Sequence, residues 1–406
     1  MKIHLVEHQD SDPIALTGSK RDQLAAALPR AVIQQHPGTD DEFVINPKNY
    51  VGLIKVGGTT VEIAPKLDIN RVLFLVAYSL DPRHWRDHLV ELDEATTLHE
   101  AIARPFADFA LTATRRGPLH GYRHHDDSLP RVKGRIRFMD QLRRHQRITT
   151  PLEVSFDDYT PDIDENRLLV AATDRLLKIQ GLGDSTRRSL HRLQRRLADV
   201  AHIRYNHHHV PSPTITRLNR NYEHPLALAR LILGDRTIEL SGEAVTSHGL
   251  LFDMATIFEA FVHTALKEAL GLNDRTFPKN AVKQPLYLDN AERVRLRPDL
   301  SWWEHGQCVM VGDVKYKKTV DGDGKEPDLY QLLAYTAAAQ VDSGYLIYAA
   351  GESVPATHSI SSVDKQLHIA TLHLANEPDD ILDEIQELAV RIRTSRLSSL
   401  GMSVAA

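Results

Sequence analysis

The stretch that decides the fold runs from Arg297-Pro298-Asp299 to Met310-Val311-Gly312-Asp313-Val314-Lys315-Tyr316. Between its ends lies Glu304-His305-Gly306, a tripeptide typical of a turn, and the flanking segments are rich in apolar residues. This pattern predicts two adjacent antiparallel strands. Because side chains alternate along a strand, Asp313 and Lys315 project from the same face, and the hairpin brings Asp299 beside them. The sequence therefore predicts an acidic pocket with an ammonium group at its edge.

Such a pocket suits a hard divalent cation. Magnesium prefers oxygen ligands and keeps several waters, so Asp299 and Asp313 together with a strand carbonyl would hold it and leave positions open for phosphate oxygens. The ion would polarise a phosphoryl oxygen and lower the pKa of a bound water, while Lys315 would orient that water or offset developing charge. An ordinary exposed hairpin is the alternative. It does not explain a carboxylate within the apolar run 309–314, because burial of an unpaired carboxylate costs several kcal/mol.

Two predicted helices flank the hairpin in the sequence. The first covers residues 252–270, with Asp253 as its cap and Glu259 in its interior. A helical glutamate is most often a solvated surface residue, but the apolar neighbours of Glu259 leave a place in the pocket equally open. The second helix covers residues 327–340 and puts Gln331 and Tyr335 four residues apart on one face, from which both could point into the same pocket.

Together these residues resemble the PD-(D/E)xK nuclease superfamily. Arg297-Pro298-Asp299 is similar to the PD element and Asp313-Val314-Lys315 to the DxK element, while Gln331-Leu332-Leu333-Ala334-Tyr335 resembles the QxxxY helix of the RecB-like branch. Within that superfamily the chain resembles McrC, the nuclease subunit of McrBC modification-dependent restriction systems. The likeness extends to residues 52–66, to residues 162–169 and, more loosely, to residues 129–136, so that it covers roughly residues 50 to 350.

The resemblance implies an α/β fold, in which a β-rich N-terminal domain precedes a C-terminal restriction-endonuclease-like mixed sheet flanked by helices. It also implies a catalytic set, which comprises Glu259, Asp299, Asp313, Lys315, Gln331 and Tyr335. The metal ligands would be Glu259, Asp299, Asp313 and the carbonyl of Val314, and the cofactor would be Mg²⁺, with Mn²⁺ as a substitute.

The same resemblance implies a partner. McrC-like subunits work with a McrB-like AAA+ GTPase hexamer, whose GTP hydrolysis they stimulate, and the complex cleaves modified double-stranded DNA in type IV restriction, an antiviral defence. A homodimer through the nuclease domain would permit scission of both strands. The chain itself has no GxxxxGK[ST] phosphate loop, so a nucleotide-driven motor must be a separate chain. A stand-alone RecB-like nuclease and a non-catalytic activator of an AAA+ ring stay open as alternatives.

Composition indicates a packed protein of more than one domain. The chain has 406 residues, of which 42% are hydrophobic and 25% charged, with a formal net charge of -5. We expect a β-rich partner-binding domain over residues 1–155, and a helical connector with the endonuclease domain over residues 156–406. The single cysteine, Cys308, excludes an intramolecular disulfide and fits a reducing cytoplasm. Neither a secretory signal nor a bilayer-spanning run is expected.

Local patterns predict the remaining elements. Strands are expected at residues 42–45, 51–56 and 60–65, the last two joined by a Gly57-Gly58 turn, and helices within residues 71–116 and at residues 166–179 and 185–200. Residues 155–162 are expected to form a linker, because acidic residues there precede and follow a proline.

One window of the chain is strongly cationic, since residues 111–150 hold ten Lys or Arg against three Asp. Within it, residues 131–137 alternate strictly, so an extended chain would place Arg131, Lys133, Arg135 and Arg137 on one face. This face is either a solvated edge strand or a surface that binds the partner or DNA. Two histidine clusters, at residues 120–125 and 207–209, are expected to be exposed loops, because they lack cysteines and a carboxylate at metal-ligand spacing.

Overall fold

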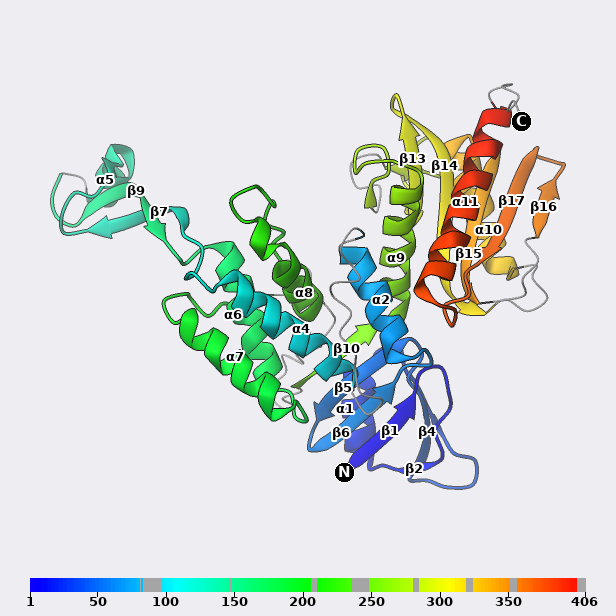
Figure 1. The fold of residues 1–406 in the computed structure, drawn as a ribbon, viewed down its shortest axis with the longest axis horizontal. Helices are drawn as coiled ribbons and strands as arrows, with labels where there is room; N and C mark the ends of the chain where they lie inside the picture. Colours follow the sequence, from blue (N-terminus) through cyan, green and yellow to red (C-terminus); the bar gives the residue numbers. More distant parts are fainter. Residues whose placement is uncertain are drawn as a thin grey trace. The chain divides into compact units, whose positions relative to one another are not determined.

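The computed structural model describes residues 1–80, 82, 97–145, 148–205, 210–234, 248–279, 285–318, 324–350 and 356–399 (Figure 1). The chain divides into two compact units. Unit 1 contains residues 1–95 and 252–406, and unit 2 contains residues 96–251. The chain therefore leaves unit 1 and returns to it, so the N-terminal strands and the candidate site belong to the same unit.

The N-terminal part of unit 1 contains short strands in two sheets. These strands are β1 (Lys2–Val6), β2 (Ile14–Ala15), β3 (Val32–Gln35), β4 (Glu42–Asn46), β5 (Tyr50–Val56) and β6 (Thr59–Ala64), with the helix α1 (Gly18–Ala27) between β2 and β3. One sheet has the order β1-β6-β5-β10 and the other the order β2-β4-β3, where β10 (His248–Asp253) is the segment that leads back into unit 1. The expected hairpin at Gly57-Gly58 is confirmed: both glycines adopt positive φ, which a tight turn between β5 and β6 requires.

The C-terminal part of unit 1 is a five-stranded mixed sheet with the order β13-β14-β15-β17-β16. Its strands are β13 (Leu300–Glu304), β14 (Gln307–Lys318), β15 (Ser343–Ala350), β16 (Thr357–Ile360) and β17 (Lys365–Thr371), and the short strands β11 (Leu286–Tyr287) and β12 (Arg295–Leu296) pair with each other. β14 pairs antiparallel with β13 and parallel with β15, and β15 is parallel to β17. The expected mixed α/β fold is confirmed.

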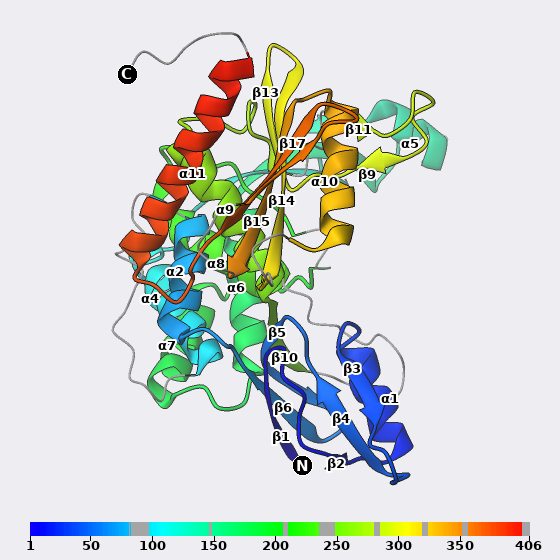
Figure 2. The same cartoon turned by 90° about the vertical axis from the view of Figure 1, so that its right-hand side faces the viewer.

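Helices cover both faces of this sheet. They are α9 (Met254–Ala269), α10 (Glu326–Ala339) and α11 (Pro378–Ser399), and α2 (Ile69–Leu80) packs on α9. α10 packs on β14, β15 and β17, whereas α9 packs on β14 from the opposite side together with α11 (Figure 2). Gly344 allows the close approach of α10, since a Cβ at that position would lie 2.5 Å from Thr336 Cγ2 and 2.9 Å from Leu332 Cδ1.

Unit 2 consists of helices and a small antiparallel sheet. Its helices are α4 (Leu98–Ala113), α5 (Phe138–His145), α6 (Asp164–Leu177), α7 (Asp184–Arg196) and α8 (Glu223–Gly234), with a 3₁₀ turn η2 (Arg220–Tyr222). β7 (Gly121–Leu129) pairs with β9 (Leu152–Thr160) along its whole length, and β8 (Arg135–Ile136) pairs with the other edge of β9. We call β7, β8, β9 and α5 together the hairpin module.

Two sequence-based predictions in unit 2 are wrong. Residues 155–160 form part of β9 instead of a linker, because alternation of half-buried and exposed residues lets them pair with β7. Only Arg135 and Ile136 of the alternating run 131–137 form a strand, since Gly134 adopts a φ of 68° and turns the chain. The division into domains at residues 155 and 156 stays a prediction. In the described residues, no helix has the length and apolar character needed to cross a bilayer.

Candidate active site

The predicted hairpin of β13 and β14 exists and carries the centre of the site. Its turn contains His305 and Gly306, both with positive φ, which matches the twist of a two-residue hairpin loop. Leu300 lies opposite Gly312, so Asp299, just before Leu300, comes next to Asp313, just after Gly312. Asp299 Oδ2 accepts a hydrogen bond of 2.8 Å from the backbone N–H of Val314. The two carboxyl groups are thus brought together by strand register, as the sequence predicted.

Asp313 is buried and has a charged partner. Its side chain is 2% exposed, and Lys315, two residues further along β14, forms an ion pair with it. Burial would lower the pKa of Lys315, but the adjacent Asp313 carboxylate has the opposite effect and the pKa is raised overall. The amine is therefore held in its charged form beside the carboxylates, which is the form that offsets negative charge on a phosphate.

The pKa of Asp299 is strongly affected by burial and by the acidic neighbours of this residue. Burial, followed by the charges of Asp313 and Glu259, raises the pKa of Asp299 to about 8. Like charges at close range disfavour ionisation, and a divalent cation would relieve that repulsion. The donor set is composed of carboxylate oxygens, which fits Mg²⁺ or Mn²⁺. Among the described residues, however, no group of three or more His, Cys, Asp or Glu side chains is arranged closely enough to form a metal cage.

Glu259 approaches this cluster from α9, which packs on β14. The cap of α9 is Asp253, as predicted, whose side chain accepts a hydrogen bond from the N–H of Ala255. Burial raises the pKa of Glu259; Lys279 opposes this effect, and Asp313 adds to it. The charge of Asp313 therefore acts on Glu259, whose role as a third ligand stays a prediction from the sequence, because the described residues contain no group of three carboxylates arranged around a metal position.

The helix α10 closes the site through a chain of hydrogen bonds. Lys315 Nζ donates to Gln331 Oε1 at 3.1 Å, and Gln331 Nε2 donates to the Tyr335 hydroxyl at 2.7 Å. Tyr335 in turn donates to the carbonyl of Arg297 at 3.3 Å. Burial raises the pKa of Tyr335 to about 12, so its hydroxyl keeps the proton that it donates. The chain of contacts fixes the Lys315 amine and links α10 to the segment that carries Asp299.

Two further contacts beside the site were not predicted from the sequence. Lys317 forms an ion pair of 2.6 Å with Asp328 at the start of α10, and the Tyr348 hydroxyl donates to the same carboxylate at 2.7 Å. On the other side, Glu7 Oε2 accepts from the backbone N–H of Lys66 at 3.1 Å and from the Tyr316 hydroxyl at 3.4 Å. The only sequence signal for Lys317 was its spacing of two from Lys315. Glu7 had none, since Tyr316 is 309 residues away.

The predicted basic surface lies in the hairpin module, and two of its four cations are paired with acidic side chains. Lys133 bonds to Asp158 at 2.7 Å and lies 4.0 Å from the centre of the Phe156 ring, and Arg137 pairs with Asp126 and Asp140. Arg131 and Arg135 are exposed, with no acidic partner in the described part of the chain.

The histidines of the first cluster contact neighbouring groups in the same module. His124 bonds to Asp157, His125 stacks on Phe156, and His120 contacts the carbonyl of Pro118. The second cluster, His207, His208 and His209, lies outside the described residues.

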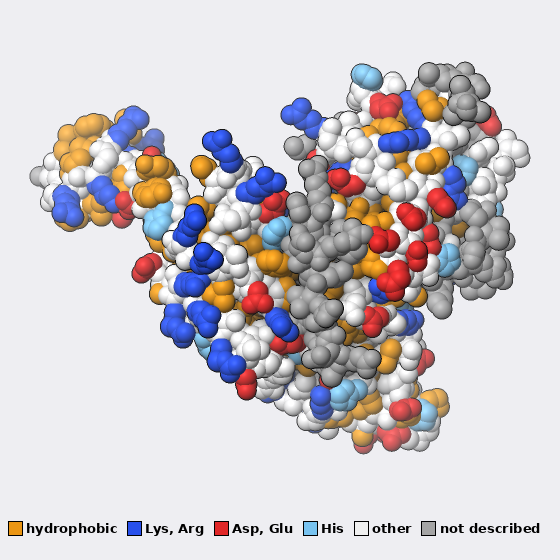
Figure 3. Space-filling model, in the orientation of Figure 1, with side chains coloured by type: hydrophobic (Ala, Val, Ile, Leu, Met, Phe, Trp, Pro, Cys, Tyr) orange, Lys and Arg blue, Asp and Glu red, His pale blue; other side chains and the backbone are white. Residues whose placement is uncertain are grey.

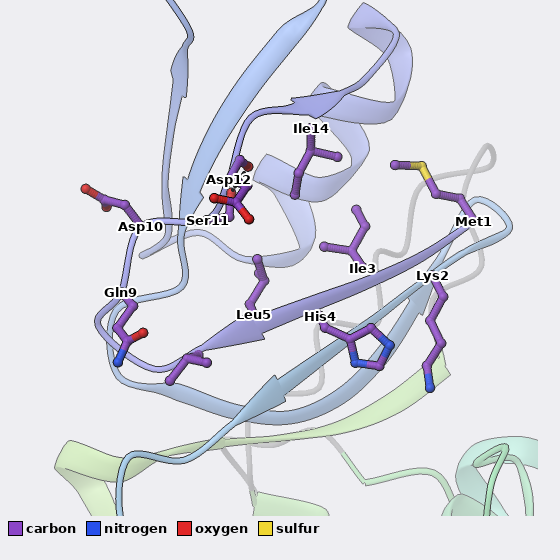
Figure 4. Close-up of a pocket in the computed structure, with 11 residues that line it drawn as sticks. Met1, Lys2, Ile3, His4, Leu5, Gln9, Asp10, Ser11, Asp12 and Ile14 are labelled. Carbon is purple, nitrogen blue, oxygen red and sulfur yellow. Dashed lines mark hydrogen bonds between the residues drawn. The ribbon is translucent and has the colours of Figure 1, made fainter.

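A separate cavity of about 500 Å³ runs along β1 (Figure 4). Strand alternation places Ile3 and Leu5 on the side of Ile14 and turns Lys2 and His4 away from it (Figure 4). Lys2 and His4 both pair with Glu62 on β6. The cavity is also lined by Asp10 and Asp12, and the predicted site residues are not among its lining residues.

The fold and the site define a mixed α/β protein in which Asp299, Asp313 and Lys315 lie together on one hairpin of the sheet, with Glu259 on the adjacent helix α9. The chain belongs to the family described as "McrBC 5-methylcytosine restriction system component", whose profile matches residues 45–349. No curated protein matches it.

One solved structure supports the fold. The chain is similar to a chain in a half-complex from a tetradecameric assembly of Thermococcus gammatolerans McrB AAA+ hexamers with bound McrC. The TM-score is 0.55 and the sequence identity 15%, and the match covers 97% of this chain and 100% of that chain. A cryo-EM structure of the Thermococcus gammatolerans McrBC complex gives a TM-score of 0.41 and 19% identity over 66% of this chain and 88% of that chain. The expected McrC-like subunit is thus confirmed at the level of family and fold.

Proposed function

We propose that this chain is the Mg²⁺-dependent DNA endonuclease subunit of a McrBC-type restriction complex. The observation that carries the proposal is the cluster of Asp299, Asp313 and Lys315 on one hairpin, with Gln331 holding the lysine amine at 3.1 Å. The expected likeness of the chain to the PD-(D/E)xK nucleases rests on this same geometry.

Each residue of the site would have a different role in phosphodiester hydrolysis. Asp299, Asp313 and the carbonyl of Val314, with Glu259 from α9, would hold the metal, which supplies Lewis-acid polarisation of the phosphate when bound. Lys315 lies beside the carboxylates with its charge retained, so it would orient the attacking water or stabilise negative charge on the phosphate oxygens. Gln331 and Tyr335 position the amine of Lys315 and do not titrate near neutral pH.

The partner that we propose is an AAA+ GTPase ring. McrB of Thermococcus gammatolerans forms AAA+ hexamers with bound McrC, and the family description specifies 5-methylcytosine. The hairpin module presents apolar side chains to solvent, with Tyr122 79% exposed and Met139 68% exposed, and exposed apolar patches mark binding surfaces. Together with Arg131 and Arg135, they form the surface that we assign to ring binding and to stimulation of GTP hydrolysis.

The test is a cleavage assay on duplex DNA that contains 5-methylcytosine, with Mg²⁺, GTP and the AAA+ partner present or omitted. We expect cutting only in the complete mixture. Lys315→Ala should lower the rate by about 100-fold or more while leaving GTPase stimulation intact. Cutting by the chain without its partner would favour a stand-alone nuclease, and GTPase stimulation without any cutting would favour a non-catalytic activator.

A further inference from the structure

The helix α7 of unit 2 exposes a row of arginines. Arg188, Arg192 and Arg195 follow one another at spacings of four and three residues, so they lie on the same face of the helix, and all three are exposed. The opposite face carries Leu190 and Leu193, which are fully buried. Packing of the leucines therefore fixes which way the arginines point, and Figure 3 shows Lys and Arg side chains gathered on the side where Figure 1 draws α7.

These arginines differ in their surroundings from several cations of the hairpin module. In the hairpin module, Lys133, Arg137 and Arg144 each form an ion pair with an Asp or Glu. Within the described residues, neither Arg188 nor Arg192 nor Arg195 has an acidic group within 4.0 Å. The usual explanation of a charged helix face, a set of mutually compensating surface pairs, does not apply to α7.

A contact between helices enlarges the cationic surface. Arg196 Nη1 donates to the carbonyl of Leu111 at 2.7 Å, which joins the end of α7 to the end of α4. Arg115 and Arg116 follow directly after α4, and both are exposed without an acidic partner in the described part of the chain. We call Arg115, Arg116, Arg188, Arg192 and Arg195 the arginine surface.

The distribution of charge between the two units points to a polyanion as the ligand. Unit 2 contains 24 Lys and Arg against 18 Asp and Glu, a formal charge of +6, whereas unit 1 contains 25 against 36, a formal charge of −11. The net charge of −5 for the whole chain hides this separation. A cationic unit within an acidic protein attracts a polyanion locally while the rest of the molecule repels it.

The dimensions of the row fit a phosphate backbone. Arg188 and Arg195 are about 10 Å apart along the helix axis at 1.5 Å per residue. One strand of B-form DNA advances about 3.4 Å per phosphate along its axis, so the row spans about three phosphates. Guanidinium groups also bind phosphate oxygens in a bidentate manner.

We propose that the arginine surface binds the phosphate backbone of double-stranded DNA, independently of the residues that cleave it. The inference rests on the proposed function, because it assigns a second contact to the same substrate. It gives unit 2 a role in holding DNA, and this role requires neither Mg²⁺ nor the partner ring. Because phosphates carry no base identity, the binding should be independent of sequence and of methylation.

The experiment measures binding of the full chain to a fluorescent unmethylated duplex by anisotropy, in EDTA, without partner or nucleotide, at several salt concentrations. The test variant is Arg188→Gln/Arg192→Gln/Arg195→Gln. The matched variant Arg188→Lys/Arg192→Lys/Arg195→Lys keeps the charge, and Arg275→Gln removes an exposed cation from unit 1. Thermal unfolding of each variant checks that the fold is intact.

We expect the glutamine variant to bind about tenfold more weakly or worse, with a salt dependence of log K that is shallower by about three. The lysine variant and Arg275→Gln should keep nearly the wild-type slope. A glutamine variant with the wild-type melting temperature, affinity and slope overturns the proposal. Unchanged DNA binding with weakened binding of the AAA+ partner also overturns it, since the surface would then meet an acidic protein.

Failure of this inference is separable from failure of the proposed function. Binding is measured in EDTA, where no cleavage by the proposed metal site takes place. Binding that is lost in the glutamine variant but kept in Arg275→Gln supports the inference, whether or not the wild type cleaves DNA.

Discussion

At the scale of single residues, the buried carboxyl group of Glu7 is the clearest case of a charge controlled by its surroundings. Its side chain is fully buried, and burial, opposed in part by the hydrogen bonds from Lys66 and Tyr316, raises the pKa of Glu7 from 4.5 to about 7. The folded state therefore holds a proton that the unfolded state releases at lower pH. Folding stability should decline as the pH rises from about 4.5 to about 7 and then level off, because the folded chain must bury the charge.

Glu7→Gln should remove the part of this decline that is due to Glu7. A shift of about 2.5 pKa units corresponds to about 3 kcal/mol between pH 4.5 and pH 8, and the amide has no charge to bury. Urea unfolding at these two pH values should show a decline that is smaller by about 3 kcal/mol in Glu7→Gln than in the wild type, since the decline due to Asp299, whose pKa is also raised, is common to both proteins. Glu62→Gln, on the neighbouring strand β6, is the control and should keep the wild-type decline. Equal declines for all three proteins would show that Glu7 is ionised in the fold.

A second prediction at the residue scale concerns Tyr335. Tyr335→Phe removes the hydroxyl that accepts from Gln331 and donates to the carbonyl of Arg297, while the ring stays in its apolar cluster with Trp303 and Val311. We expect a loss of about 1 kcal/mol in unfolding free energy. The rate of cleavage should fall by about tenfold, because the amine of Lys315 is less well held. A stability loss with an unchanged kcat would assign Tyr335 a structural role alone.

The residues of the site that could be predicted are those whose spacing is local. Asp313 and Lys315 share a strand face, and the turn at Gly306 sets the register that brings Asp299 to them. Glu7 and Asp328 could not be found in this way. Their roles depend on burial and on partners on other elements, and strand or helix periodicity contains no such information.

At the scale of elements, the distance between α10 and the sheet determines where Gln331 lies. Gly344 on β15 provides the space, since any Cβ there would overlap Thr336 and Leu332 of α10. The helix is otherwise held by the apolar cluster of Leu332, Leu346 and Tyr348. A side chain at position 344 must therefore move the helix and the residues of the site that it carries.

Gly344→Ala should destabilise the fold by about 1 to 3 kcal/mol through overpacking. It should also lower the rate of cleavage, because it moves α10 and the site residues that α10 carries. Gly18→Ala is the control, because a Cβ there meets nothing within 4 Å. Urea unfolding compares the two variants. Wild-type stability in Gly344→Ala would mean that α10 can shift without cost.

Most helices and the central hairpins could be predicted, because apolar periodicity and glycine turns act within a few residues. The pairing of β7 with β9 could not. Twenty-two residues separate Leu129 from Leu152, and the acidic residues of β9, such as Asp157 and Asp158, are solvated or paired with cations of β7 and of the loop before β8. A strand stabilised by ion pairs lacks the apolar alternation by which strands are recognised.

At the scale of the whole molecule, the chain returns to unit 1 after unit 2, so the candidate site and the N-terminal strands share one unit, while the helices with the arginine surface belong to the other. Domain boundaries inferred from composition follow the order of the chain and do not detect such an insertion. The charge separation between the units is equally hidden in the net charge. The proposed cleavage site therefore lies in unit 1, and the proposed DNA and partner contacts lie in unit 2.

The central claim is that Asp299 and Asp313 hold a divalent ion beside Lys315. Titration of the full chain with Mn²⁺, followed by electron paramagnetic resonance of the free ion and by competition with Mg²⁺, tests it most directly. We predict that the wild type binds Mn²⁺, that Mg²⁺ displaces it, and that Asp313→Asn weakens binding by about 100-fold or more. Equal Mn²⁺ binding by the wild type and by Asp313→Asn would contradict the claim.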